Sequence, residues 1–376
     1  MAVNAQSPGK LDLWPTYVTL RGRRPARFGR PMPVCPLCEA SYPAGVRFCG
    51  VDGQALGKIS ETIDKLIGSR LGDAYELTVQ VGRGAFGAVY AARHVQTPGE
   101  FAVKLLRSGT QAAPEQVARF RREVSILAKV ISPHVVPIVQ YGHDAGKGYY
   151  LVMPLLSGEN LAERLARKGP LPLPELSKMV DHVTAALQCA HQAGVIHRDI
   201  KPENIYLHTS DDGQITVKLL DFGLAKLLRP PQGDQGPSED LQTGPTQVLG
   251  SPSTMSPEQV LSQPVDARSD LYSFGVVLFE ALTGQLPFDA ESAVQLMRKQ
   301  VYDPPPRPSE DCPWLSEDLE KIVLDLLAKR PSLRPQSAEE LRQTWQAALP
   351  MGLEKWRRHQ LHRSPTVVTG LDKPPK

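Results

Sequence analysis

The segment HRDIKPEN, residues 197–204, is the most informative stretch of this 376-residue sequence. Pro202 disfavours a helix here and favours a fixed loop, because proline has no N–H to donate. The tripeptide DFG, residues 221–223, follows an apolar run that predicts a strand. Asp199 and Asp221 would each be ordinary turn residues if taken alone. Their order and spacing, together with the motifs that precede them, indicate that they act together.

A glycine-rich segment lies upstream, where residues 81–89 read VGRGAFGAV and contain the pattern Gly-x-Gly-x-x-Gly. Alone, this pattern also marks dinucleotide-binding turns and ordinary hairpins. Residues 88–93 predict a second strand and no helix, which disfavours a dinucleotide-binding fold. No Walker A lysine follows, which disfavours a P-loop NTPase. A glycine-rich hairpin instead suits a flap whose backbone amides lie over nucleotide phosphates.

A lysine and a glutamate come after this hairpin. Lys104 lies on an apolar strand predicted at residues 100–106. Glu123 lies beside the apolar face of a helix predicted at residues 114–130. Either residue alone would most simply be a solvated surface charge. Because they follow a phosphate loop, the two are predicted to form a pair that fixes the α- and β-phosphates.

Together these segments resemble the catalytic motifs of eukaryotic-type protein kinases. The wording RFRREV, HRDIKPENI, MSPEQ and DARSDLYSFG is most similar to bacterial Hanks-type serine/threonine kinases, and the resemblance covers residues 73–349. It implies an α+β, bilobal protein kinase fold with a β-rich N-lobe at residues 73–153 and a helical C-lobe at residues 158–349. The implied activity is transfer of the γ-phosphate of ATP, with Mg²⁺, to serine or threonine hydroxyls of protein substrates.

The resemblance also implies a role for each motif residue. Asp199 matches the residue that accepts or orients the substrate hydroxyl proton, and Lys201 matches the one that neutralises charge on the γ-phosphate. Asn204 and Asp221 match the Mg²⁺ ligands. The other residues implied in binding ATP are Gly82, Arg83, Gly84, Ala85, Phe86, Gly87, Val89, Ala102, Lys104, Met153 and Leu156. Pro154 stands where the hinge usually has Glu, so the donated adenine contact is expected from Leu156.

Two further contacts are implied in the second half of the chain. Glu258 is expected to form a salt bridge with Arg334, and Asp270 is expected to anchor the backbone of the catalytic loop. Ser256 stands where the family usually has Ala. Two more differences from the family are Ser251 in place of Thr and Thr254 in place of Tyr. These differences affect the substrate side and leave the phosphate machinery intact.

Residues 221–258 are expected to form an activation segment. Arg198 matches an arginine that receives a phosphate from this segment through charge-assisted hydrogen bonds. Autophosphorylation is therefore predicted at Thr246, with Thr243 as the second candidate. A transient homodimer would allow this transfer in trans. An unmodified flexible loop is the alternative.

Cysteines near the N-terminus suggest a separate module at residues 34–57. Cys35, Cys38 and Cys49 form two knuckles that resemble a zinc ribbon, with Asp52 in the fourth position. Three thiolates and a carboxylate can bind one tetrahedral Zn²⁺. A degenerate ribbon without metal and a redox pair are the alternatives. The expected role is structural support or docking of a partner.

The remaining segments are predicted from pattern and composition. Residues 1–33 are expected to be a disordered basic tail, 58–72 a linker with a short helix, and 350–376 a disordered tail. Strands are expected at 75–81, 88–94, 100–106, 135–141, 148–153 and 217–220, and helices at 114–130, 159–168, 174–193, 269–282, 292–300, 316–328 and 338–349. The apolar run 271–282 is too short to span a bilayer and predicts a buried core helix.

The overall composition and charge bear on the partners and the localisation of the protein. The net charge of +3 gives no reason to expect nucleic acid or a membrane as a partner, and no signal peptide is recognisable. A cytoplasmic protein is therefore expected. Two other functions are weighed: a pseudokinase scaffold that acts by binding, and a kinase of small molecules. The complete catalytic set disfavours the first, and the long activation segment disfavours the second.

Overall fold

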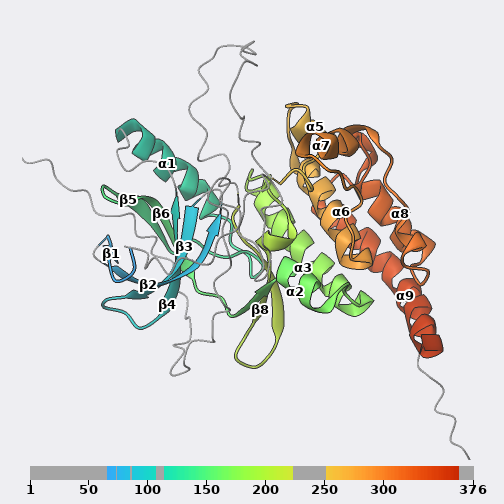
Figure 1. Cartoon of the computed structure of the whole chain (residues 1–376), viewed down its shortest axis with the longest axis horizontal. Coiled ribbons are helices and arrows are strands. Elements are labelled where there is room, and N and C mark those ends of the chain that lie inside the picture. Colours follow the sequence, from blue (N-terminus) through green and yellow to red (C-terminus); the bar gives the residue numbers. More distant parts are fainter. Residues whose placement is uncertain (1–65, 73, 85–86, 107–113, 223–250, 364–376) are drawn as a thin grey trace, which may run out of the picture. The chain divides into compact units, whose positions relative to one another are not determined.

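The computed structural model describes residues 66–72, 74–84, 87–106, 114–222 and 251–363. The chain divides into two compact units, and the described residues change from the first to the second between Ser157 and Gly158. Each unit is described by itself below, and Figure 1 labels most of the elements of both.

The first unit contains a six-stranded antiparallel sheet in the order β1-β2-β3-β4-β6-β5. Its elements are β1 (Arg70–Leu71), β2 (Tyr75–Gly84), β3 (Gly87–His94), β4 (Glu100–Leu106), α1 (Pro114–Leu127), β5 (Gln140–Asp144) and β6 (Gly148–Pro154). Neighbouring strands are joined in sequence along β1 to β4, so short turns connect most of the sheet (Figure 1). The predicted β-rich lobe is confirmed.

Each face of this sheet has its own apolar cluster, because side chains alternate along a strand. Val103 and Leu105 of β4 belong to the cluster on one face. Leu106 belongs to the other cluster, in which Phe120 and Val124 of α1 pack on the sheet. Helix α1 therefore buries the apolar stripe that its sequence predicts. Lys104 alternates with Val103 and Leu105, so it points to the face that α1 covers.

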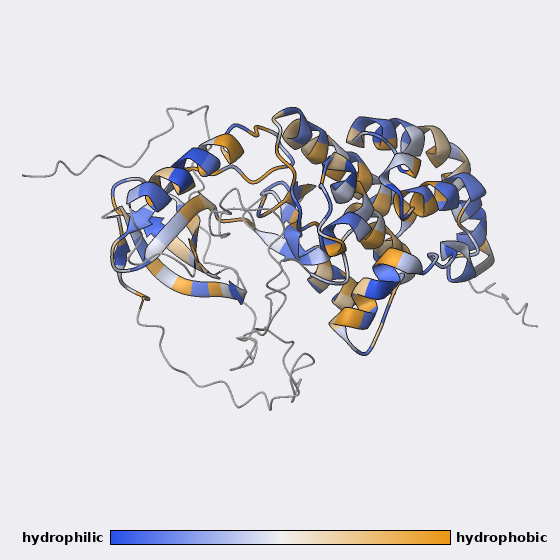
Figure 2. Cartoon of the chain, turned by 90° about the horizontal axis from the view of Figure 1, so that it is seen from above, coloured by the Kyte–Doolittle hydropathy of each residue, from blue (hydrophilic) through white to orange (hydrophobic). Residues whose placement is uncertain are grey.

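The second unit is mainly helical. Its helices are α2 (Leu161–Lys168), α3 (Leu173–Gln192), α5 (Pro257–Val260), α6 (Ala267–Thr283), α7 (Ala293–Tyr302), α8 (Glu317–Leu326) and α9 (Ala338–Arg363), and its sheet has the order β7-β8-β9, with β7 (Gly158–Asn160), β8 (Ile205–Thr209) and β9 (Ile215–Leu219). Helix α6 is buried on nearly every side, as predicted for its apolar run. Hydrophobic and hydrophilic residues alternate along the other helices, so each presents one side to the core (Figure 2).

Helix ends in this unit follow the capping chemistry of their sequences. Asn160 caps α2 in a capping box, and its side chain accepts from the N–H of Glu163. Ser292 and Ser316 cap α7 and α8 in the same position. Helix α6 ends at Gly284, whose φ of 81° is a left-handed conformation that glycine adopts without strain.

The structure corrects three predictions about the limits of elements. Strand β5 begins at Gln140, so the prediction of a strand from residue 135 is wrong for its first part. Arg70 and Leu71 form β1 and pair with β2, so the end of the predicted linker belongs to the first unit. Leu71 is buried in its core, which explains the pairing.

The third correction concerns the predicted disordered tail from residue 350. Helix α9 continues through Pro350 to Arg363. The reason is tertiary packing, because Gly352 lies against Leu319 of α8 and the Lys355 ammonium donates to the carbonyl of Leu315 at 2.5 Å. Among the described helices, none has both the length and the apolar character needed to cross a membrane.

Candidate active site

The segment at residues 197–204 lies between α3 and β8 and has no α-helix, as Pro202 predicts. Its last three residues, Pro202–Asn204, form a single 3-10 turn with proline at the first position, where no N–H is needed. The N–H of Asn204 donates to the carbonyl of Lys201 at 3.0 Å and closes this turn. The end of the loop is therefore closed by a hydrogen bond between backbone atoms.

Asp199 has two carboxylate oxygens in different environments. Its Oδ2 lies 2.9 Å from the Lys201 ammonium and accepts a 3.0 Å hydrogen bond from the Asn204 amide. The same amide donates to the backbone carbonyl of Asp199 at 2.7 Å. Its Oδ1 is buried and has no hydrogen-bond partner among the described residues. A buried acceptor without a donor is costly, so Oδ1 is suited to receive a hydroxyl donor from outside the chain.

Asn204 and Asp221 lie next to each other in the fold. The N–H of Leu220 donates to the carbonyl of Asn204 at 2.9 Å and fixes the start of the DFG segment beside the catalytic loop. Asp221 has a φ of 60°, a left-handed conformation that is strained for a residue with a side chain. The amide nitrogen of Asn204 is used by Asp199, so its amide oxygen is the atom that can bind a cation. An amide oxygen and a carboxylate are ligands that Mg²⁺ prefers.

His197 also joins the two segments. Its Nε2 lies 2.8 Å from the carbonyl oxygen of Leu220, and its ring packs on Phe222 at a centroid distance of 4.5 Å. Its Nδ1 accepts from the N–H of Asp199 at 3.3 Å. This role of His197 was not predicted from the sequence.

Asp270 holds the backbone of the catalytic loop, which confirms the prediction. The N–H groups of His197 and Arg198 donate to its two carboxylate oxygens, each at 2.8 Å. Arg198 has a φ of 67°, again in the left-handed region. The ring of His191, at the end of α3, lies 2.8 Å from the same carboxylate and adds a contact that the sequence did not indicate.

The predicted salt bridge between Glu258 and Arg334 is also confirmed. Both side chains are buried, and the two guanidinium N–H groups donate to the two carboxylate oxygens at 2.7 and 2.9 Å. The Ser269 hydroxyl adds a third donor to Glu258. Burial alone would raise the pKa of Glu258, but the hydrogen bonds from Arg334 and Ser269 outweigh it and hold the pKa below its usual value.

In the first unit, the glycine-rich motif forms the end of the β2–β3 hairpin, as predicted. Gly84 pairs with Gly87, and Arg83 and Val89 are on the same two strands. Gly87 has a φ of 148°, and a Cβ there would lie 1.8 Å from the carbonyl oxygen of Leu105. Only glycine fits that position. Ala85 and Phe86 lie outside the described residues.

Three more predicted residues, Lys104, Ala102 and Met153, lie on strands β4 and β6, which continue the sheet beyond the hairpin. Lys104 is 6% exposed and lies opposite Val89 of β3. Ala102 lies opposite Met153 of β6, so these two predicted nucleotide contacts are neighbours on two inner strands of the sheet. Leu156 follows β6 and is half-buried.

Glu123 lies on α1, as predicted, and takes part in an ion pair within that helix. The partner in this pair is Arg119, one turn earlier on α1, at 3.8 Å. The pair of Glu123 with Lys104 stays a prediction. The prediction placed both residues on the correct elements, β4 and α1.

Other predicted residues fall outside the part of the chain that the structure describes. They are the phosphorylation candidates Thr243 and Thr246 and the zinc candidates Cys35, Cys38, Cys49 and Asp52.

Comparisons with known proteins agree with this geometry. Residues 75–346 match the model of the protein kinase domain family, so the chain belongs to that family. It is 35% identical to the serine/threonine-protein kinase pkn3 of Myxococcus xanthus over 286 residues, which cover 76% of this chain and 51% of the relative. It is 37% identical to the serine/threonine-protein kinase PknB of Mycobacterium tuberculosis over 277 residues, which cover 73% of this chain and 42% of that protein.

The chain thus spans about half the length, or less, of the curated relatives it matches. Among solved structures, it resembles a double mutant of the PknI kinase domain of Mycobacterium tuberculosis with a TM-score of 0.59 at 24% identity, covering 76% of this chain and all of that one. A single mutant of the same domain gives a TM-score of 0.57 at 26% identity, covering 77% of this chain. These likenesses support the protein kinase fold.

Proposed function

We propose that this chain is a serine/threonine protein kinase that transfers the γ-phosphate of ATP to hydroxyl groups of protein substrates. The observation that carries the proposal is the carboxylate of Asp199. One of its oxygens is held by Lys201 and Asn204, and the other is buried without a partner among the described residues. Lys-Pro-Glu at residues 201–203 is the form typical of the serine/threonine branch.

The residues have distinct roles in this proposal. Asp199 accepts or orients the proton of the substrate hydroxyl, and Lys201 offsets charge on the transferred phosphate. Asn204 and Asp221 hold Mg²⁺, which neutralises the negative charge of the phosphates when it is bound. Lys104 binds the α- and β-phosphates. The remaining ATP-binding residues are Gly82, Arg83, Gly84, Ala85, Phe86, Gly87, Val89, Ala102, Met153 and Leu156.

The direct test is transfer of labelled phosphate by the purified chain in the presence of Mg²⁺. Asp199→Asn keeps the size of the side chain but removes the base, and should lower the rate at least ~100-fold. Asp211→Asn is the matched control, because Asp211 is exposed in the turn between β8 and β9. Equal labelling by wild type and Asp199→Asn would contradict the proposal. No labelling in any of the three would favour a scaffold that acts by binding.

Regulation by the activation segment is part of the same proposal. The backbone N–H and carbonyl of Arg198 are both bonded, yet its guanidinium has no hydrogen-bond partner among the described residues. It therefore suits a phosphate on Thr246 or, as second candidate, Thr243, placed there in trans by a transient homodimer. Mass spectrometry of active enzyme should find one of these residues phosphorylated. Active enzyme without either modification would contradict this part.

The cysteines near the N-terminus support a proposal of their own. Cys35, Cys38, Cys49 and Asp52 would bind one Zn²⁺ in a ribbon that docks a partner. Elemental analysis of the purified chain should find about one zinc per molecule, and Cys35→Ser should lose it. Cys189→Ser, on α3, is the control, and wild-type chain without zinc would contradict the ribbon.

A further inference from the structure

Arg198 and Asp199 share a peptide unit that is held from both sides. Its N–H belongs to Asp199 and donates to Nδ1 of His197 at 3.3 Å. Its carbonyl belongs to Arg198 and accepts a 3.0 Å hydrogen bond from the side-chain amide of Gln259. The φ of Arg198 is 67°, so the peptide is held in a conformation that a residue with a side chain does not adopt readily. The orientation of this peptide decides where the carboxylate of Asp199 points.

Gln259 comes from a different element, the short helix α5. Ser256 is the N-cap of α5, and Gln259 occupies the third helical position in a capping box. The Gln259 amide oxygen accepts from the N–H and the hydroxyl of Ser256, both at 3.0 Å. With the oxygen used by the cap, the NH₂ end is left for the carbonyl of Arg198. One end of the side chain is therefore fixed at the start of α5, and the other end reaches the catalytic loop.

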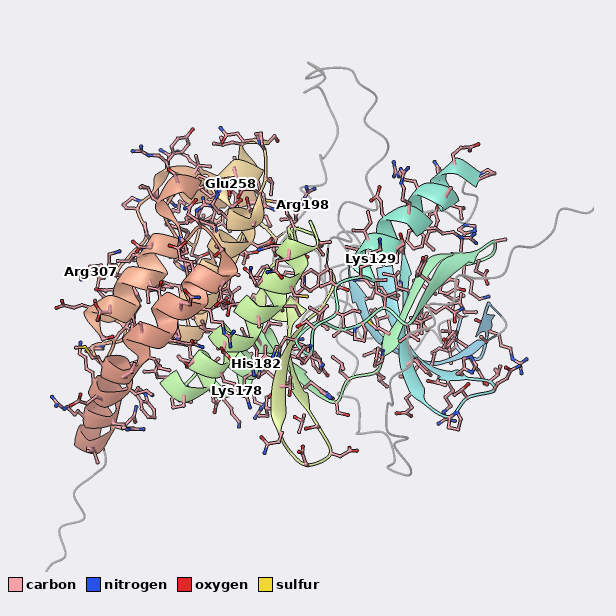
Figure 3. All side chains as sticks on the ribbon, turned by 180° about the vertical axis from the view of Figure 1, so that it is seen from behind. Lys129, Lys178, His182, Arg198, Glu258 and Arg307 are labelled. Carbon is pink, nitrogen blue, oxygen red and sulfur yellow. The ribbon has the colours of Figure 1, made fainter. Side chains whose placement is uncertain are left out.

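Helix α5 is itself firmly placed within the second unit. Glu258, beside Gln259, forms the buried salt bridge with Arg334. The residues before α5 are also held, because the hydroxyl of Ser273 donates to the carbonyl of Thr254 and the amide of Gln300 donates to the carbonyl of Ser253, each at 2.6 Å. Figure 3 labels Glu258 and Arg198, the residues on the two sides of this connection. Gln259 thus transmits the position of a well-anchored segment to the loop that carries the base.

We propose that Gln259 is a positioning residue for phosphoryl transfer, which orients the peptide between Arg198 and Asp199 and so aims the open oxygen of Asp199. This inference rests on the proposed kinase activity. Through Gln259, the position of the end of the activation segment would affect the orientation of Asp199 directly, without a contact to ATP. It also explains why Ser256, where the family usually has Ala, is compatible with activity, since its hydroxyl fixes the amide of Gln259.

The capping box allows the two roles of Gln259 to be separated. Gln259→Glu keeps an acceptor for the cap, because glutamate is equally suited to this helix position. It replaces the donating NH₂ with an oxygen that faces the carbonyl of Arg198. We expect kcat for phosphorylation of dephosphorylated casein to fall at least about tenfold with KM for ATP within about twofold of wild type, because geometry near the reacting group changes while nucleotide binding does not. The midpoint of thermal unfolding should stay near that of wild type.

Gln295→Glu is the matched control. Gln295 occupies the same third position of α7, behind its N-cap Ser292, and is exposed. It should leave kcat unchanged. If Gln259→Glu does not fold, Gln259→Leu, which also lacks the donor, replaces it in the same assay. A folded Gln259 variant with wild-type kcat would overturn the inference.

A double-variant comparison separates positioning from a general structural effect. In the Asp199→Asn background, Gln259→Glu should cause no further loss, because the group that it orients is already gone. A further tenfold loss in that background would show that Gln259 acts elsewhere and would overturn the inference. If Asp199→Asn transferred phosphate as fast as wild type, the proposed kinase function itself would be contradicted. Failure of the proposed function can therefore be distinguished from failure of the inference about Gln259.

Discussion

At the scale of single residues, charged groups in the second unit differ in whether a partner compensates their burial. Glu258 is buried with Arg334, and each carboxylate oxygen receives a guanidinium N–H. Glu280 of α6 is half-buried, and burial, followed by the charge of Glu203, raises its pKa to about 7. Burial of a charged carboxylate costs free energy in both cases. Hydrogen bonds offset this cost at Glu258, whereas at Glu280 the cost raises the pKa. Two predictions follow from this difference.

Arg334→Met should destabilise the second unit by about 3–5 kcal/mol, because it leaves the carboxylate of Glu258 buried without its counter-charge. Arg358→Met is the matched control. Arg358 pairs with Glu354 on the exposed surface of α9, and such pairs contribute less than about 1 kcal/mol. Urea denaturation of the two variants and wild type measures the difference. Similar free energies of unfolding for both variants would show that the Glu258 pair does not stabilise the unit.

Glu280→Gln should raise stability at pH 8 and have little effect at pH 4.5. The folded pKa of about 7 lies above the unfolded value of 4.5, so the folded state binds more protons between these values and its stability falls as the pH rises through them. Above pH 7 the carboxylate is charged in the fold and its cost is complete. Thermal unfolding at both pH values measures the effect, with the exposed Glu291→Gln as control. An equal shift at pH 4.5 and pH 8 would contradict the raised pKa.

At the scale of elements, helix α9 shows how packing can extend a helix beyond its sequence signals. Pro350 removes a backbone donor inside α9, and an interior proline ordinarily breaks a helix. Further along, a Cβ on Gly352 would lie 2.3 Å from a methyl group of Leu319, so α9 and α8 are in close contact there. Trp345, earlier in α9, is 1% exposed and donates to the hydroxyl of Ser177 on α3. Contacts with two other helices therefore hold α9 in place.

Gly352→Val tests this contact. The added side chain would overlap Leu319, and overpacking of this kind costs about 1–3 kcal/mol. Met351→Val introduces the same residue at the adjacent position, which is 65% exposed, and should change stability by no more than about 0.5 kcal/mol. Denaturant unfolding of the two variants measures the difference. Equal stability would show that the close contact of Gly352 with Leu319 does not stabilise the fold.

At the scale of the whole molecule, the sequence predicted contacts made by motif residues better than the limits of elements. Asp270 and the pair of Glu258 with Arg334 were predicted because family motifs specify the residues on both sides of each contact. The pair of Glu123 with Lys104 stays a prediction. The start of β5 was misplaced. Val135 is buried, but it does not belong to a strand, so its apolar character did not indicate strand pairing. Gln259 could have been found, since Ser-x-x-Gln is a capping signal.

If the kinase proposal holds, binding of ATP with Mg²⁺ should stabilise the folded chain against unfolding. A non-hydrolysable ATP analogue with Mg²⁺, at about 100 times its Kd, should raise the stability by about 2.7 kcal/mol and the unfolding midpoint by roughly 5 °C or more. Asp221→Asn should lose the part of this shift that requires Mg²⁺, because it removes a carboxylate ligand of the cation. Its response with EDTA in place of Mg²⁺ should match that of wild type.

The control for this experiment is Asp211→Asn. It makes the same substitution as Asp221→Asn, also in the second unit, but at an exposed aspartate. It should keep the complete Mg²⁺-dependent shift. Lys104→Met, in the first unit, should reduce the shift with and without Mg²⁺, because an ammonium that binds the phosphates acts on the nucleotide directly. If Asp221→Asn retained the wild-type shift while Lys104→Met lost it, the nucleotide would bind through the first unit without the proposed metal site. If neither variant changed the shift, the proposed nucleotide-binding residues would be wrong.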